Sequence, residues 1–151
     1  MLIRLIVPGE QARVEDLNTS LEAVLTRHRI DAGVRGDVRL IVEELASNAI
    51  AYGGGADGAD VGQHELSVDI AIAGDLLTLE FRDEGAPFDP MSVPAPDLDA
   101  DILDRPIGGL GLYLIRKIAE DTRYQRIGDC NVLQVSLRIP NLENHAMENR
   151  A

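Results

Sequence analysis

The sequence has little of what several large classes of protein require. It contains a single cysteine, Cys130, which excludes an internal disulfide and lies far from any histidine that would suggest a thiol nucleophile, so we expect a reducing compartment. No run of apolar residues approaches the roughly 20 that span a bilayer. Residues 1–7 are too short, and too interrupted by Arg4, for a signal peptide. We therefore expect a cytoplasmic protein with no membrane partner.

Basic residues are also scarce. Lysine and arginine number 14 against 26 aspartates and glutamates, giving a net charge of -12, and no basic cluster is dense enough to neutralise a run of phosphates. We therefore expect no nucleic acid partner. The acidic surface is compatible with a basic protein or a magnesium-complexed anion, and more simply with a role in solubility alone.

The chain is long enough for one domain. Its 151 residues and apolar fraction of 45% suit a single hydrophobic core, which we expect within residues 1–140. Residues 141–151, after Pro140, are expected to form a polar C-terminal tail.

Hydrophobic periodicity predicts five strands and three helices. The strands are expected at residues 2–7, 66–72, 77–83, 124–127 and 133–139. The helices are expected at residues 10–28, 34–49 and 112–119, with Gly33 and Gly36 loosening the chain before the second. This order predicts an α+β fold, a two-layer sandwich whose mostly antiparallel sheet is covered on one face by helices.

The second predicted helix carries two polar residues beside its apolar stripe. On a helical wheel Glu44 and Asn48 fall together at the border of the buried face, whereas Glu43 points to water. Of the two adjacent acids, only Glu44 could therefore enter a pocket roofed by the sheet. Taken alone, the pair also fits ordinary boundary residues of an amphipathic helix.

Two further segments supply groups suited to a nucleotide. An apolar strand delivers Asp83 to a turn two residues before Gly85. A carboxylate there can accept from an exocyclic amine, and a glycine lets a flat base approach the backbone, although an ordinary strand-ending turn also fits. The glycine turn at residues 108–112 opens a helix whose backbone N–H groups suit phosphate oxygens.

The familiar glycine-loop folds do not fit this turn. It lacks the third glycine of a dinucleotide fingerprint and follows a loop rather than a strand, and the chain contains no Gly-Lys-Ser/Thr, so Rossmann and P-loop sites are excluded. Residues 86–107 before it carry five prolines and are longer than most connections, so we expect a lid.

Taken in order, three motifs resemble the GHKL ATPase superfamily, whose Bergerat fold unites DNA gyrase, histidine kinases and related proteins. They are Glu44-Leu-Ala-Ser-Asn48-Ala, Asp83-Glu-Gly85-Ala-Pro-Phe-Asp-Pro90 and Gly108-Gly-Leu-Gly-Leu-Tyr-Leu-Ile115. Within the superfamily they look most like the small anti-sigma-factor serine kinases of bacterial partner-switching systems. The resemblance covers roughly residues 5–139.

The resemblance implies ATP and Mg²⁺ as cofactors. Asn48 would ligate magnesium through its side-chain oxygen. Glu44 would be the general base that draws a proton from an incoming hydroxyl. Asp83 would read the adenine amine, and Gly85 would make room for the ring.

The same resemblance assigns the phosphates to the lid and the glycine turn. The residues implied are Gly109, Leu110, Gly111 and Leu112. Arg105 is a further candidate for γ-phosphate contact, and it also fits a solvated loop arginine. Two positions depart from the family pattern: Tyr52 stands where many relatives carry histidine, and the closing strands show no threonine placed to support the adenine site.

The implied activity is that of an ATP-dependent protein serine/threonine kinase. Such a kinase phosphorylates a small antagonist protein and, when free, sequesters a sigma factor or another regulatory protein; a homodimer is compatible with the resemblance. Two alternatives stay open, a non-catalytic ATP-binding partner switch and a detached histidine-kinase catalytic domain. The three histidines are scattered and form no ligand set, and no dimerising helix pair that would carry a phosphoacceptor is present, which argues against a complete histidine kinase.

Overall fold

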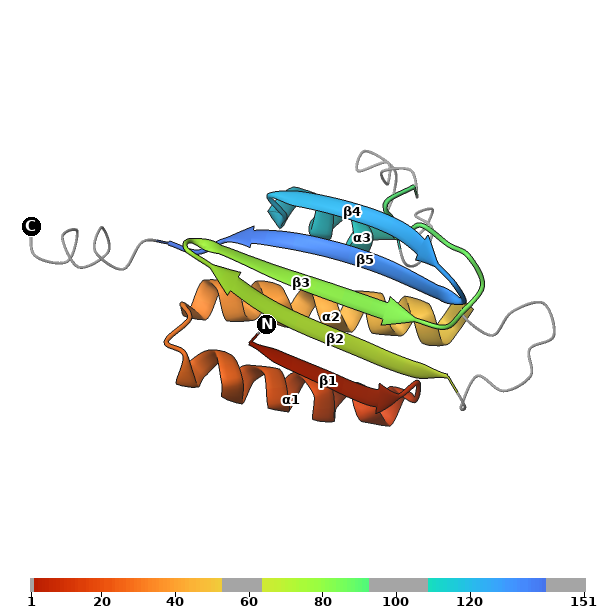
Figure 1. The fold of residues 1–151 in the computed structure, drawn as a ribbon, viewed down its shortest axis with the longest axis horizontal. Coiled ribbons are helices and arrows are strands. Elements are labelled where there is room, and N and C mark those ends of the chain that lie inside the picture. The colour runs from red at the N-terminus through yellow and green to blue at the C-terminus, as the bar shows by residue number, and fades with distance from the viewer. Residues whose placement is uncertain (1, 53–63, 93–108, 141–151) are drawn as a thin grey trace, which may run out of the picture.

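The computed structural model describes residues 2–52, 64–92 and 109–140. These residues form a two-layer α+β sandwich (Figure 1). The strands are β1 (Ile3–Pro8), β2 (Glu65–Ala73), β3 (Leu76–Asp83), β4 (Asp121–Ile127) and β5 (Cys130–Arg138). The helices are α1 (Gln11–Arg27), α2 (Ala32–Tyr52), α3 (Gly109–Ile118) and the short 3₁₀ helix η2 (Pro90–Ser92). Among the described residues, no helix is both long enough and apolar enough to cross a membrane.

The five strands form one antiparallel sheet in the order β1-β2-β3-β5-β4. Two tight hairpins, β2–β3 and β4–β5, turn at Gly74 and Gly128, whose φ angles of 61° and 58° suit glycine. The central pairing of β3 with β5 is not between consecutive strands. It places Asp83, at the end of β3, directly opposite Asn131 near the start of β5.

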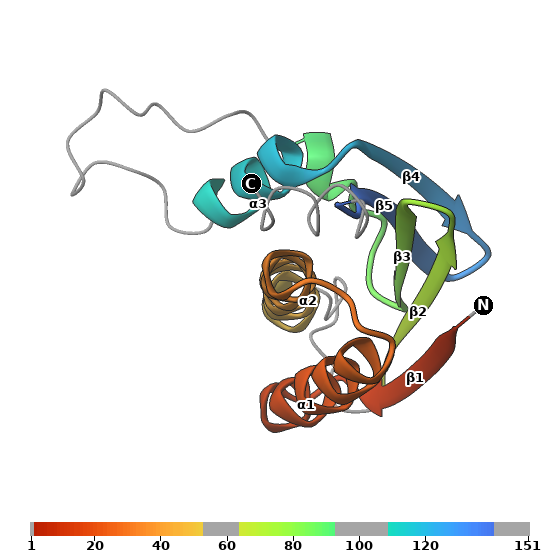
Figure 2. The same ribbon diagram turned by 90° about the vertical axis from the view of Figure 1, so that its left-hand side faces the viewer.

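The core lies between the sheet and the helices. Figure 2 shows α1, α2 and α3 on the same side of the curved sheet, and no helix of the described residues covers the other side. Alternate residues of the strands point into this layer because side chains of a strand alternate between its faces. They include Leu66, Val68, Ile70, Leu77, Leu79, Phe81, Leu133, Val135 and Leu137, all buried. The predicted α+β sandwich is confirmed.

Several predicted boundaries were wrong. α2 begins at Ala32, so Gly33 and Gly36 lie inside it rather than in a loosened connection. The Asp31 carboxylate accepts a hydrogen bond from Gly33 N–H at 3.0 Å, which satisfies a free donor of the first turn and compensates for the poor helix propensity of glycine.

The other corrections concern α3, β4 and β5, and β5 begins at Cys130 rather than at Leu133. α3 begins at Gly109 rather than at Leu112, so the glycine segment forms its first turn. β4 begins at Asp121, three residues before the predicted start at Tyr124, because an edge strand exposes most of its residues and lacks a clear apolar alternation. Most of the predicted lid and the whole predicted tail lie outside the described residues.

One buried side chain in α1 is poorly matched to its surroundings. Asn18 lies on the apolar face of the helix and is 3% exposed. Among the described residues neither polar atom of its side chain has a hydrogen-bond partner. A buried polar group without a partner costs about 1–3 kcal/mol.

Replacing Asn18 with leucine should therefore stabilise the protein. Leucine has the same branching as asparagine and removes both unpaired polar groups, which should increase stability. Its methyl groups are slightly larger than the amide atoms, and the tighter packing offsets part of that increase. We therefore expect the free energy of unfolding to rise by about 1 kcal/mol. Urea denaturation followed by circular dichroism measures the change. The neighbouring exposed Thr19, replaced with leucine, is the control and should change stability by less than about 0.5 kcal/mol. A lower stability of Asn18→Leu would mean that the amide has partners the folded protein needs.

Candidate functional site

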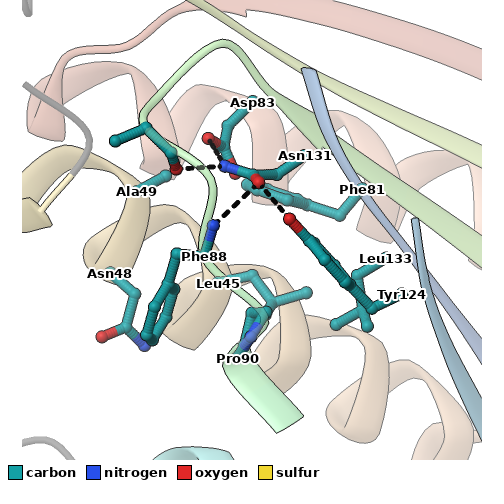
Figure 3. A pocket seen from close by; sticks show the side chains of 11 residues that line it. Leu45, Asn48, Ala49, Phe81, Asp83, Phe88, Pro90, Tyr124, Asn131 and Leu133 are labelled. Atoms are coloured by element: carbon teal, nitrogen blue, oxygen red, sulfur yellow. Dashed lines mark hydrogen bonds between the residues drawn. The ribbon is translucent and has the colours of Figure 1, made fainter. Parts of the chain in front are cut away.

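A pocket lies between α2 and the sheet, beside the ends of β3, β4 and β5 (Figure 3). Its lining comes from α2, from the central strands, from edge strand β4 and from the segment that follows β3. The residues are Leu45, Asn48, Ala49, Phe81, Asp83, Ala86, Phe88, Pro90, Tyr124, Asn131 and Leu133. Mostly apolar walls with a few convergent polar groups are typical of a small-molecule site.

The pocket is small and partly open to solvent. Its empty volume, including the part open to solvent, is about 420 Å³. Phe88 lines the pocket and is 40% exposed.

Asp83 is held in a fixed orientation at the end of β3. Its Oδ1 accepts hydrogen bonds from Gly85 N–H at 2.9 Å and from Asn131 Nδ2 at 3.0 Å. Both bonds use Oδ1, which leaves Oδ2 as the oxygen that could accept from a ligand amine. Gly85 is buried, and its carbonyl accepts from the Arg126 guanidinium at 2.7 Å. The sequence-predicted pair of Asp83 and Gly85 thus forms one compact turn.

Asn131 and Tyr124 are site residues that the sequence analysis missed. Asn131 is buried at the rim of the pocket and is bonded to Asp83, and the Tyr124 hydroxyl donates to Asn131 Oδ1 at 2.6 Å. The sequence carried no clear signal for Asn131, because it lies before the predicted start of the last strand at residue 133, whereas β5 begins at Cys130. The pairing of β3 with β5 is what brings this amide to Asp83.

Glu44 and Asn48 lie one turn apart on α2. The Asn48 amide nitrogen donates to the Glu44 carbonyl oxygen at 2.9 Å, so the side-chain oxygen of Asn48 is the atom left for a cation. The adjacent Glu43 faces away, as predicted, since it pairs with Arg39 on the helix surface at 3.2 Å. Asn48 lines the pocket together with Asp83.

The Glu44 side chain packs against the first turn of α3. A methyl group added at Gly111 would overlap the Glu44 carboxylate, so the glycine makes space for this acid. The packing of α2 on α3 therefore brings the two α2 residues, Glu44 and Asn48, together with the glycine segment. They meet at the N-terminus of α3, where backbone N–H groups favour anions.

The other residues predicted to contact phosphate lie in different surroundings. Gly109 and Leu110 lie in the first turn of α3, and the Leu110 side chain is exposed. The Leu112 side chain is buried in the core, so only its backbone could face a ligand. Arg105 lies outside the described residues.

The donor atoms suit a metal that arrives with its ligand. Among the described residues, no group of three or more histidines, cysteines, aspartates or glutamates could hold a metal ion. Asn48 offers one side-chain oxygen, and Glu44 offers a carboxylate one turn away. Magnesium is commonly held by one or two protein oxygens together with phosphates and water, so these residues fit a magnesium-nucleotide complex.

Comparisons with known proteins show which proteins have a similar fold. A family model described as the histidine kinase-like ATPase domain matches residues 7–137. The RsbU and RsbW domains of Rv1364c from Mycobacterium tuberculosis have a similar fold, with a TM-score of 0.63 and 14% identity over 91% of this chain and 31% of that one. This chain therefore spans about a third of that solved structure.

A second solved structure is similar over nearly its whole length. The SiaB-SiaC complex from Pseudomonas aeruginosa gives a TM-score of 0.56 with 14% identity, over 92% of this chain and 90% of that one. A search of curated proteins found no match.

Proposed function

Because the chain belongs to the histidine kinase-like ATPase family, we propose that it is an ATP-dependent protein serine/threonine kinase of a partner-switching system. It would phosphorylate a small antagonist protein and, when free, hold a sigma factor or another regulatory protein. The observation that carries the proposal is the convergence of Glu44, Asn48, Asp83 and Gly111 at one end of the α2–sheet layer.

The residues divide into a base-binding part and a phosphate-binding part. Asp83 Oδ2 accepts from the adenine amine, and Gly85 leaves room for the ring. Asn48 offers its oxygen to magnesium, and the first turn of α3 presents N–H groups to phosphate oxygens. Bound Mg·ATP supplies the phosphoryl group, while its metal screens the phosphate charge.

Glu44 completes the site as the general base. Its carboxylate lies between α2 and the first turn of α3, next to the phosphate-binding N–H groups. A serine or threonine hydroxyl presented there would give its proton to Glu44 as its oxygen attacks the γ-phosphorus, and the bond from that phosphorus to the departing ADP would break. General base catalysis contributes typically 10²–10⁴-fold, and most of the remaining acceleration comes from positioning and electrostatics.

A protein partner is supported by two features. In the Pseudomonas structure, SiaB is in complex with SiaC, so a chain of this fold assembles there with another protein. In this chain, Leu110 and Leu114 are exposed one turn apart on α3, beside the site. An apolar contact at this point would bring a phosphoacceptor close to Glu44.

The first test of the proposal is calorimetric titration of Mg·ATP into the protein. We expect saturable binding that weakens when magnesium is removed, because Asn48 then loses the cation that links it to the phosphates. Absence of binding to folded protein would overturn the kinase proposal and leave an interaction module.

A transfer assay then separates the kinase from the alternatives. With γ-labelled ATP and the cognate antagonist, we expect acid-stable phosphate on serine or threonine of the antagonist. Binding without transfer would identify a non-catalytic ATP-binding switch. Acid-labile phosphate on histidine would identify a detached histidine-kinase catalytic domain.

A further inference from the structure

The Asn131 amide uses its full hydrogen-bonding capacity at the edge of the pocket (Figure 3). Its nitrogen donates to Asp83 Oδ1 at 3.0 Å and to the Ala86 carbonyl at 2.8 Å. Its oxygen accepts from Phe88 N–H at 3.0 Å and from the Tyr124 hydroxyl at 2.6 Å. A primary amide has two donors and two lone pairs, so every position is occupied.

This arrangement sets the orientation of the amide. A half-turn of the group would point its oxygen at Asp83 Oδ1 and Ala86 O, two acceptors, and its N–H groups at the Phe88 N–H. Asn131 is 6% exposed, so water cannot readily replace the lost bonds. Buried donors and acceptors without partners cost about 1–3 kcal/mol each, and the observed orientation is strongly favoured.

The same amide joins two parts of the pocket that are separate in the sequence. Through Asp83 it contacts the carboxylate at the end of β3, and through Ala86 and Phe88 it fastens the wall that follows. Arg126 reinforces that wall by bonding to the Gly85 carbonyl. The orientation of the carboxylate and the position of the wall therefore depend on one side chain.

We propose that Asn131 is the positioning residue for base recognition. By occupying Asp83 Oδ1 it turns Oδ2 toward the pocket, and by holding Ala86 and Phe88 it sets the wall against which the base packs. The inference rests on the proposed ATP site. It assigns base selectivity to the pairing of Asp83 with Asn131 rather than to Asp83 alone.

ATP and inosine triphosphate (ITP) together measure this orientation. ATP carries an amine at carbon 6, which donates to a carboxylate, whereas ITP carries a carbonyl oxygen there, which a carboxylate repels. The ratio of the two affinities reports how well Oδ2 faces the base. A purely structural defect would lower both affinities and leave the ratio unchanged.

The experiment is calorimetric titration of Mg·ATP and Mg·ITP into wild type, Asn131→Leu, Asn131→Asp and Gln134→Leu. Wild type should favour ATP about tenfold or more. Asn131→Leu should bring the ratio to within about threefold of unity, because Asp83 is no longer held by the amide. The control Gln134→Leu removes an amide from the opposite, exposed side of the same strand and should keep the wild-type ratio.

Asn131→Asp keeps the shape and the acceptor oxygen but removes both donated bonds. It also places a carboxylate against Asp83 Oδ1, so the preference for ATP over ITP should disappear, as in Asn131→Leu. If the leucine variant fails to fold, Asn131→Asp still tests the inference.

The outcomes separate the inference from the function on which it rests. Wild type that binds neither nucleotide overturns the proposed function. Wild type that prefers ATP, with folded Asn131 variants that keep that preference, overturns the inference alone. Loss of the preference in the Asn131 variants but not in Gln134→Leu supports it.

Discussion

Replacing Gly111 with alanine is expected to abolish most phosphotransfer while leaving the protein folded. The added methyl would occupy the space of the Glu44 carboxylate. The methyl would also overlap the Glu44 Cγ, so the side chain must rotate about its first side-chain torsion to move aside, which leaves the backbone in place. Alanine also favours a helix over glycine by about 1 kcal/mol, so the stability of α3 should not fall.

The size of the loss follows from the role proposed for Glu44. If this acid is the general base, displacing it should slow transfer to the antagonist by about 10²–10⁴-fold, as Glu44→Gln should. Combining the two substitutions should add little, since both remove the same group from the same place. Transfer rates at saturating Mg·ATP measure the effect, with ATP affinity determined in parallel.

Gly36 provides a matched control. It is also a helical glycine, and a methyl added there would meet no atom of the described residues within 4 Å. Gly36→Ala should therefore transfer phosphate at the wild-type rate and gain up to about 1 kcal/mol of stability. If Gly111→Ala were as active as Gly36→Ala, the placement of Glu44 against α3 would not matter for the reaction, and its assignment as the base would be wrong.

Asp83→Asn is expected to weaken ATP binding by about 10- to 100-fold, because a hydrogen bond to a charged group contributes about 1.5–3 kcal/mol. The orientation of the new amide is predictable. Gly85 N–H and Asn131 Nδ2 both donate to the Oδ1 position, so the amide oxygen should stay there and its nitrogen should take the place of Oδ2.

An N–H group in the place of Oδ2 should also change the base preference. It would repel the adenine amine and donate to the carbonyl of ITP, so Asp83→Asn should bind ITP more tightly than ATP. Calorimetric titration with both nucleotides measures the reversal. The adjacent exposed acid, in Glu84→Gln, should behave as wild type. A variant that kept its preference for ATP would show that Asp83 does not contact the base.

Elements with strong periodicity could be predicted from the sequence. The alternation in β2 and β3 and the apolar stripe of α1 lie within single elements, so the local pattern was sufficient. The start of α2 could not be predicted in this way, because two glycines obscure the start of a helix that Asp31 caps. The start of β4 was missed because most residues of this edge strand are exposed, so its sequence does not need the alternation of apolar and polar residues that marks a strand.

The sequence by itself determined the local parts of the site. One helical turn separates Glu44 from Asn48, and one tight turn joins Asp83 to Gly85, so backbone geometry alone sets these neighbours. Only the tertiary structure decided what each part meets. Asn131, 48 residues from Asp83, reaches it because β3 pairs with β5, and Glu44 reaches Gly111 because α2 packs on α3. Such contacts depend on strand order and helix packing, which no local spacing encodes.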